Sequence, residues 1–163
     1  MGIGMKWILA AIVSLGGLVA FPIIAQSYDF NRYSVSVWHG HRATPSFTGT
    51  QRRYLMLRTR LQDGFLNNPL TAGHYVVIEI GCGTQCTGVS FGDVANGKII
   101  PFPLGGEDFP GLDLKTAPDS RLVVARWGSS FEHQCTQRQY VIQAARFVQV
   151  GRDKHFNTDC YNV

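Results

Sequence analysis

Residues 1–26 constrain this chain more than any other segment, and they read MGIGMKWILAAIVSLGGLVAFPIIAQ. A single charge, Lys6, precedes an uncharged run from Trp7 to Ala25, and polar residues begin at Gln26. A charged start, an apolar centre and a small residue at the exit are typical of a secretory signal peptide. We therefore predict that residues 1–25 are a leader and that the rest of the chain is periplasmic or secreted.

An uncleaved anchor is the alternative interpretation of the same segment, because its uncharged run is almost long enough to cross a bilayer. Gly16, Gly17 and Pro22 disfavour the long helix that an anchor requires. No second apolar run of spanning length follows. A membrane contact is therefore expected only through an uncleaved leader.

Composition indicates one folded domain over residues 26–163. Of the 163 residues, 45% are hydrophobic and only 16% are charged, which excludes a disordered polyelectrolyte. The 18 glycines and 7 prolines follow no repeat period, so collagen-like and solenoid designs are excluded and many turns are expected.

Four cysteines follow the leader, and an even number in an exported chain predicts disulfides. We expect Cys82 to pair with Cys86, because the short span between them forces them together, and Cys135 to pair with Cys160. A zinc site would need closely spaced pairs such as C-x2-C, whereas this chain has C-x3-C and two isolated cysteines. No metal and no other cofactor is expected.

Apolar residues spaced three and four apart predict an amphipathic helix over Thr50–Leu66, with Thr48 or Thr50 as its cap and its end before Pro69. Alternating and β-branched patterns predict about six or seven strands. We place these strands at Tyr33–Trp38, Gly73–Ile80, Thr87–Val94, Ile99–Phe102, Arg121–Trp127, Gln139–Gln143 and Arg146–Val150.

Turn signals order these elements. Asn96-Gly97 is expected to form a type I′ hairpin turn, and a second hairpin is expected to turn at Ala144-Ala145. Residues 103–118 are predicted to form a long loop, and residues 151–163 a polar tail held by its cysteine. Because most strands are adjacent in sequence, the economical architecture is a single α+β domain, a mostly antiparallel sheet with one helix, stapled by disulfides.

The histidines offer candidate chemistry with an alternative in each case. His39 and His41 at a strand end would place both rings on one face, as a metal pair requires, or they are surface residues beside Arg42. His74 begins an apolar strand, where it is either a hydrogen-bonded, half-buried residue or a base that activates Cys82. A cysteine already bonded in a disulfide would exclude that nucleophile.

Acidic residues are sparse. Glu79 interrupts an apolar strand and is expected either to pair with an arginine or to face outward. Glu107 and Asp108 are the only adjacent acids, and nothing in the sequence places them across a cleft, as glycoside hydrolysis requires. No catalytic residue is therefore assigned.

A basic helix face is formed by Arg52, Arg53, Arg58 and Arg60, with Arg42 before them. Such a face suits nucleic acid, but an exported location argues against that partner. The anionic partners outside the cytoplasm are phospholipid head groups, lipopolysaccharide, peptidoglycan acids and acidic protein surfaces. A plain solvated helix face is the alternative.

The block from Arg58 to Pro103 contains AGHY, then GCG-x-x-C, then NGK, and is followed by Pro118-Asp-Ser-Arg-Leu-Val-Val124. In this it resembles a family of small exported bacterial proteins of unassigned function with the same order of motifs. The resemblance covers about half of the chain beyond the leader. It implies a secreted, compact, β-rich domain and transfers no catalytic residue.

These features predict an exported, periplasmic binding module of the inhibitor or immunity type, acting on a cell-envelope enzyme. The loops 39–50 and 103–118 are long enough to form its contact surface. The partner is expected to be another envelope or secreted protein, or an anionic envelope polymer, and not a nucleic acid. The alternatives are a structural component of the envelope or of a secretion system, and a small envelope hydrolase that uses His74 with a cysteine or an acid.

Overall fold

The structure, a computed structural model, describes residues 28–129 and 133–162. This part of the chain forms one α-helix and two antiparallel sheets of four strands each. The predicted α+β architecture, mostly β, is therefore confirmed, with slightly more strands than the expected six or seven. The leader predicted over residues 1–25 lies outside the described residues.

Within each sheet, strands that are adjacent in sequence pair with each other, as short connections favour. The first sheet has the order β1-β2-β3-β4, with the bounds Leu70–Thr71, Tyr75–Gly83, Cys86–Asp93 and Lys98–Pro101. The second sheet has the order β5-β6-β7-β8, with the bounds Asp113–Ala117, Ser120–Trp127, Cys135–Gln143 and Arg146–Phe156.

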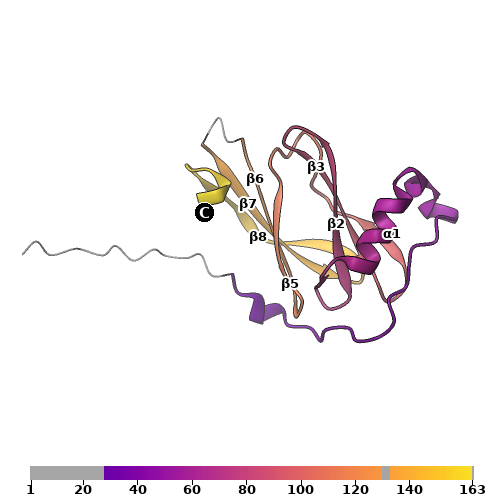
Figure 1. Cartoon of the computed structure of the whole chain (residues 1–163). Helices are drawn as coiled ribbons and strands as arrows, with labels where there is room; N and C mark the ends of the chain where they lie inside the picture. Colours follow the sequence, from indigo (N-terminus) through magenta and orange to yellow (C-terminus); the bar gives the residue numbers. More distant parts are fainter. Residues whose placement is uncertain (1–27, 130–132, 163) are drawn as a thin grey trace, which may run out of the picture.

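The helix and the two sheets form three layers (Figure 1). α1 (Arg58–Asn67) covers the outer face of the first sheet, where Leu61 and Phe65 pack on Val76 of β2. Because side chains alternate across a strand, Tyr75 points to the opposite face and joins the core between the sheets. The first sheet is therefore buried on both faces over much of its area.

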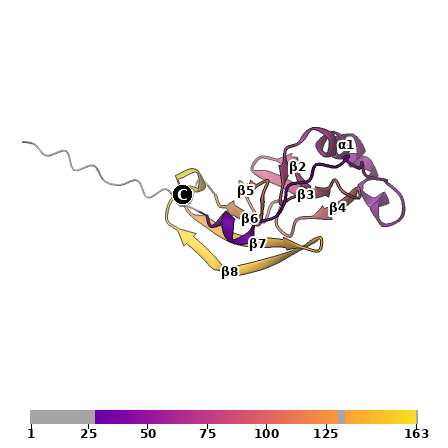
Figure 2. The same ribbon diagram turned by 90° about the horizontal axis from the view of Figure 1, so that it is seen from below.

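Aromatic rings fill the space between the sheets. Phe91 of β3 lies 4.9 Å from Phe147 of β8, and Phe102 lies 5.4 Å from Tyr140 of β7, both in edge-to-face contact. Such contacts stabilise a core beyond the area that they bury. Tyr140 and Phe147 lie on the long β7–β8 hairpin, which passes beneath the first sheet in the view of Figure 2.

The helix predicted over Thr50–Leu66 is only half α-helical. The segment begins as a 3₁₀ helix, η2 (Gly49–Leu57), and becomes α-helical at α1. Thr48 makes no side-chain cap bond, and no residue of η2 is buried. Because short helices depend on packing for their stability, only the part that packs through Leu61 and Phe65 is α-helical.

The prediction of a strand over Tyr33–Trp38 is wrong. Residues Phe30–Tyr33 form a 3₁₀ helix, η1, and an extended segment follows. This segment makes single hydrogen bonds with two different partners, Val35 N–H with Asp119 and Trp38 N–H with Gly73. No one strand runs beside it, so the alternating pattern does not produce a ladder.

Both predicted turns form hairpins, but the type I′ geometry expected at Asn96-Gly97 is found at Ala144-Ala145. Of Asn96 and Gly97, only Gly97 has a positive φ, and the loop spans four residues between Asp93 and Lys98. Ala144 and Ala145 instead both have positive φ, 48° and 58°, in a two-residue turn. That turn uses a conformation that alanine disfavours.

Two further segments differ from the prediction. β5 (Asp113–Ala117) forms inside the expected loop 103–118, because β6 offers it a partner strand. The expected tail from residue 151 continues β8 as far as Phe156. No helix among residues 28–129 and 133–162 combines the length and the apolar character that a bilayer span requires.

Candidate functional site

Both predicted disulfides are present. Cys82 is bonded to Cys86, and Cys135 to Cys160. No cysteine thiol is free. The nucleophilic cysteine considered from the sequence is therefore excluded, and two disulfides are consistent with maturation in an oxidising compartment.

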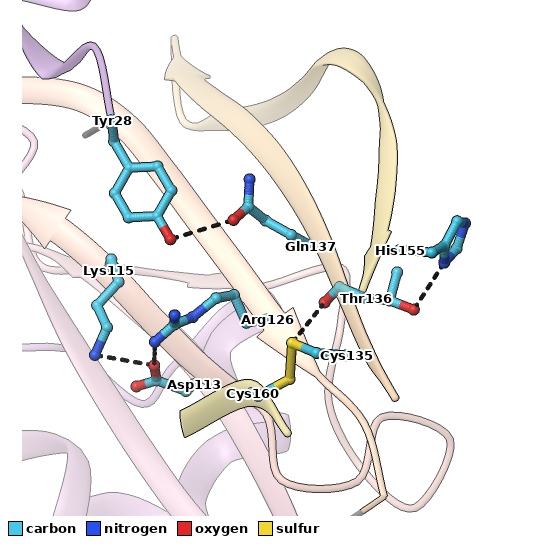
Figure 3. Close-up of a disulfide and its surroundings, with 9 residues drawn as sticks. All are labelled: Tyr28, Asp113, Lys115, Arg126, Cys135, Thr136, Gln137, His155 and Cys160. Carbon is cyan, nitrogen blue, oxygen red and sulfur yellow. Dashed lines mark hydrogen bonds and ion pairs between the residues drawn. A yellow bond between two sulfur atoms is a disulfide. The ribbon is translucent and has the colours of Figure 1, made fainter. Parts of the chain in front are cut away.

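The Cys135–Cys160 disulfide lies among contacts that link segments distant in the sequence (Figure 3). Beside it, the Tyr28 hydroxyl donates to Gln137 at 3.2 Å, and Asp113 contacts Arg126 and Lys115, both at 3.0 Å. Burial opposes ionisation of Asp113, but the hydrogen bonds from the two cations outweigh it and hold its pKa below the usual value. These contacts fasten the second sheet and the start of the described chain.

An open strand edge lies on the side of β2 that faces away from β3. β1 pairs with the beginning of that edge, Leu70 with Val76 and Thr71 with Tyr75. β2 continues as far as Gly83. Most of β2 therefore has a neighbouring strand on one side alone.

Pro69 explains why β1 is short. One further step in the β1–β2 register places Pro69 opposite Val77, and proline has no N–H to donate. The Asn68 side chain supplies the donor instead, with Nδ2 at 2.6 Å from the Val77 carbonyl oxygen. Before Asn68 the chain is already helical, so nothing continues β1 along β2.

Beyond that point the backbone of β2 points outward. Val89 lies opposite Glu79 and uses its carbonyl to accept from Phe102 on its other side. Thr87 lies opposite Gly81 and likewise accepts from the loop that follows β4. Glu79–Val89 and Gly81–Thr87 are therefore non-hydrogen-bonded pairs of the antiparallel ladder. In such pairs, both residues direct their N–H and C=O groups away from each other. The backbone groups of Glu79 and Gly81 therefore face the open side.

Within the described part of the chain, the side chain of Arg60 contacts this outer part of the edge. Arg60 Nε lies 3.4 Å from the Glu79 carbonyl oxygen, at the long limit for a hydrogen bond. The Glu79 carboxylate is exposed. Arg60 thus contacts Glu79 through its backbone, and a partner strand could displace it at small cost.

Hollows flank the open edge on both faces. One of about 360 Å³ lies between α1 and β2 and is bordered by Arg60 and Asp63. The other, of about 130 Å³, lies between β2 and β5 and is bordered by Val77 and Leu114. Both of these apolar side chains pack on the inter-sheet core but are only partly buried. The core is therefore open to solvent at the seam between β2 and β5.

The short disulfide closes the far end of the same edge. It joins Cys82 of β2 to Cys86, the first residue of β3, across a Cα–Cα distance of 5.1 Å. Gln85 between them adopts a positive φ of 58°. Because the bond fixes this turn, the backbone of Gly81 and Gly83 is held in place before any partner arrives.

Two other strand edges, those of β4 and β8, are protected in the ways that soluble proteins use against unwanted pairing. The outer edge of β4 is capped, because Gln51 Oε1 accepts from Ile99 N–H at 2.7 Å and Pro101 has no N–H. β8 carries a positive-φ glycine, Gly151, and charged residues such as Lys154 along its exposed length. Beyond Pro69, the β2 edge carries the exposed Glu79 and, at its far end, a bulge with the positive-φ Gly83. Its open stretch is therefore the short run around Glu79 and Gly81.

Arg42, expected on a binding surface, is half-buried and contacts the end of the helix. Its Nη1 lies within hydrogen-bonding distance of the carbonyl oxygens of Phe65, Leu66 and Asn68, at 2.9–3.1 Å. These are among the last carbonyls of α1 and its cap, which have no partner within a helix. A cation at this end also matches the helix dipole.

His74 lies next to a buried acid. Its Nε2 is 3.6 Å from Asp93, which is only 4% exposed. The Asp93 carboxylate also accepts from Ala95 N–H and Asn96 Nδ2, and so organises the β3–β4 turn. The half-buried histidine anticipated from the sequence is thus what the structure contains.

The remaining candidates are exposed. His39 and His41 lie on an extended loop, not at a strand end, and Glu107 and Asp108 lie on a turn. Among the described residues, no group of three or more histidines, cysteines or acids is placed to hold a metal ion. Arg52 and Arg53 lie on η2, away from the open edge.

Comparison of the chain with protein-family models, with curated proteins and with solved structures finds no match. The resemblance noted from the AGHY and GCG-x-x-C motifs therefore stays a prediction. Glu79 is the one predicted surface residue that lies on the open edge. The sequence did not reveal the edge itself, although Pro69, four residues before Gly73, is the signal that could have indicated a truncated strand.

Proposed function

We propose that this chain is a periplasmic or secreted binding module that captures an extended segment of another envelope or secreted protein by adding it as a strand to β2. The observation that carries the proposal is the length mismatch between β1 and β2, which leaves the backbone of Glu79 and Gly81 facing outward. An inhibitor or immunity-type protein acting on a cell-envelope enzyme is the kind of molecule that this site suits.

The seam supports recognition in two ways. Backbone hydrogen bonds from an added strand contribute about 0.5–1.5 kcal/mol each and do not depend on the partner's side chains. Specificity comes from the hollows, because alternate side chains of a strand point to opposite faces. One set would face Val77 and Leu114 and should be apolar, and the other would face Arg60 and Asp63 and should be polar.

A library of random short peptides displayed on phage tests the proposal with the chain as it is recovered after export. We expect enriched peptides to alternate apolar and polar residues and to lack proline in their centre. Glu79→Pro should abolish their binding, because proline removes the outward N–H. Proline is tolerated on an open strand edge, and a thermal melt confirms that the variant is folded.

Glu79→Gln is the matched control. It removes the charge but keeps the backbone N–H, so peptide binding should be retained within a few fold. Peptides that bind Glu79→Pro as well as wild type, or the absence of any enriched peptide, would refute strand addition at this edge.

A further inference from the structure

A second exposed surface lies on η2, the 3₁₀ segment that leads into α1. Both views of the molecule place η2 and the start of α1 at the end opposite the C-terminus (Figures 1 and 2). We call the segment Gly49–Arg58 the arm. Its last turn, Leu55-Met56-Leu57, exposes three consecutive apolar side chains, with Met56 94% exposed and Leu55 44% exposed.

The 3₁₀ geometry decides which residues of the arm share a face. With three residues per turn, side chains at i and i+3 lie above one another. Arg53 therefore shares a ridge with Met56, and Arg52 shares one with Leu55. The third ridge begins with Tyr54, which packs against the outer core. Each outward ridge thus combines an arginine with an apolar side chain.

The charge of the arm is of one sign. It contains Arg52, Arg53 and Arg58 and no acid. Among the described residues, no carboxylate forms an ion pair with any of the three. Arg53 is instead held over the Tyr54 ring at 4.8 Å, with its Nη2 donating to the Tyr54 hydroxyl. These cations are available to an anionic partner.

The base of the arm is fixed to the sheet. Gln51 Nε2 donates to the carbonyls of Ser46 and Gly97, and Gln51 Oε1 accepts from Ile99 N–H. The apolar side chains therefore project from an anchored support, and docking would not require the arm to fold first.

We propose that the arm docks the protein on an anionic lipid surface, with Leu55 and Met56 entering the interface and the arginines at the level of the phosphates. An apolar tip between cations is the composition that peripheral membrane contacts use. The tip is a projection and not a groove, so it suits a soft, flat lipid surface better than a rigid protein. This contact is independent of strand addition at β2.

Co-sedimentation with vesicles tests the proposal, again with the chain as recovered after export. We expect binding to vesicles of equal parts phosphatidylglycerol and phosphatidylcholine, weakening as salt is added, and much weaker binding to phosphatidylcholine alone. Met56→Asp and Arg53→Glu should each lower the affinity for the anionic vesicles about tenfold, since one basic residue near such a surface contributes about fivefold. Met56→Leu, which keeps an apolar side chain at this position, should bind the anionic vesicles as wild type does.

Matched controls come from β8, outside the arm. Val148→Asp replaces another exposed apolar residue, and Arg152→Glu reverses another exposed charge. Both should bind anionic vesicles as wild type does. Equal losses in the arm and control variants would show that only net charge matters, and would overturn the proposal.

A location-specific readout covers the case in which the leader is retained and itself binds lipid. Met56 is the single methionine of residues 26–163, so its labelled methyl group gives one assignable NMR signal. We expect that signal to broaden with anionic vesicles that carry a paramagnetic lipid, and to stay sharp with neutral ones. An unchanged Met56 signal would refute the lipid contact, and an acidic protein surface would then be the alternative partner of the arm.

Discussion

Removing each disulfide separately distinguishes a bond that stabilises the fold from one that shapes the binding edge. The perturbations are the double variants Cys135→Ser with Cys160→Ser, and Cys82→Ser with Cys86→Ser. The first bond closes a loop with a sequence separation of 25, the second a loop with a separation of 4.

The chain-entropy model turns these separations into stabilities. It assigns about 3.5 kcal/mol to the long loop and about 2 kcal/mol to the short one. Each bond has one buried partner, Cys135 at 1% exposed and Cys86 at 7% exposed, so a buried serine hydroxyl adds a cost to both variants. The expected difference in stability therefore comes from the loop lengths.

Thermal unfolding followed by circular dichroism measures the difference. We expect the Cys135 and Cys160 variant to lose about 2–4 kcal/mol and the Cys82 and Cys86 variant to lose less. Binding of the selected peptides should show the opposite order, because loss of the short disulfide frees the backbone of Gly81. A large melting shift with intact peptide binding in the short-loop variant would refute this reasoning.

Three further substitutions test individual contacts. Arg42→Ala should lower the unfolding free energy by about 1.5–3 kcal/mol in a denaturant titration, because it leaves carbonyls of the α1 end unpaired, and Arg42→Lys should recover part of the loss. Ala144→Asn with Ala145→Gly should raise the melting temperature by about 3–6 °C, since both positions have positive φ and Asn-Gly suits that turn; a lower melting temperature would contradict the assigned turn. Arg138 donates to Asp153 at 2.8 and 2.5 Å, and these hydrogen bonds hold the pKa of Asp153 below its usual value. The pair therefore stabilises the fold above pH about 4, and the stability advantage of wild type over Asp153→Asn, about 1 kcal/mol at pH 7, should vanish as the pH falls through the folded-state pKa.

Local signals in the sequence were sufficient for much of the fold. The strands expected at Gly73–Ile80 and Thr87–Val94 match β2 and β3 to within a few residues, and the spacing of Cys82 and Cys86 predicted their bond. These elements pair across one short turn, so their pattern and their partner lie close together in the chain.

Elements that depend on distant partners were not predicted. β5 (Asp113–Ala117) lies in a glycine-rich stretch and forms because β6 accepts it. The alternating pattern of Tyr33–Trp38 is genuine, yet no strand lies along it. Propensity and periodicity describe the segment itself, whereas strand formation requires a neighbour.

The candidate site was harder to predict than the fold for the same reason. Glu79 was identified because an acid interrupts an apolar strand, but its importance lies in its backbone. Whether that backbone is paired depends on where β1 ends, and this depends on Pro69. Arg42 was read as a surface cation because its partners, the carbonyls of Phe65 and Leu66, are more than twenty residues away.

Amide hydrogen exchange of the free protein, followed residue by residue by NMR, tests the open edge most directly. The account predicts fast exchange for Glu79 and Gly81, whose N–H groups face outward. It predicts slow exchange for Ile78 and Ile80, whose N–H groups point to β3. An added strand peptide should then slow Glu79 and Gly81 selectively. Slow exchange of Glu79 and Gly81 in the free protein would show that the edge is already paired, and would contradict the account.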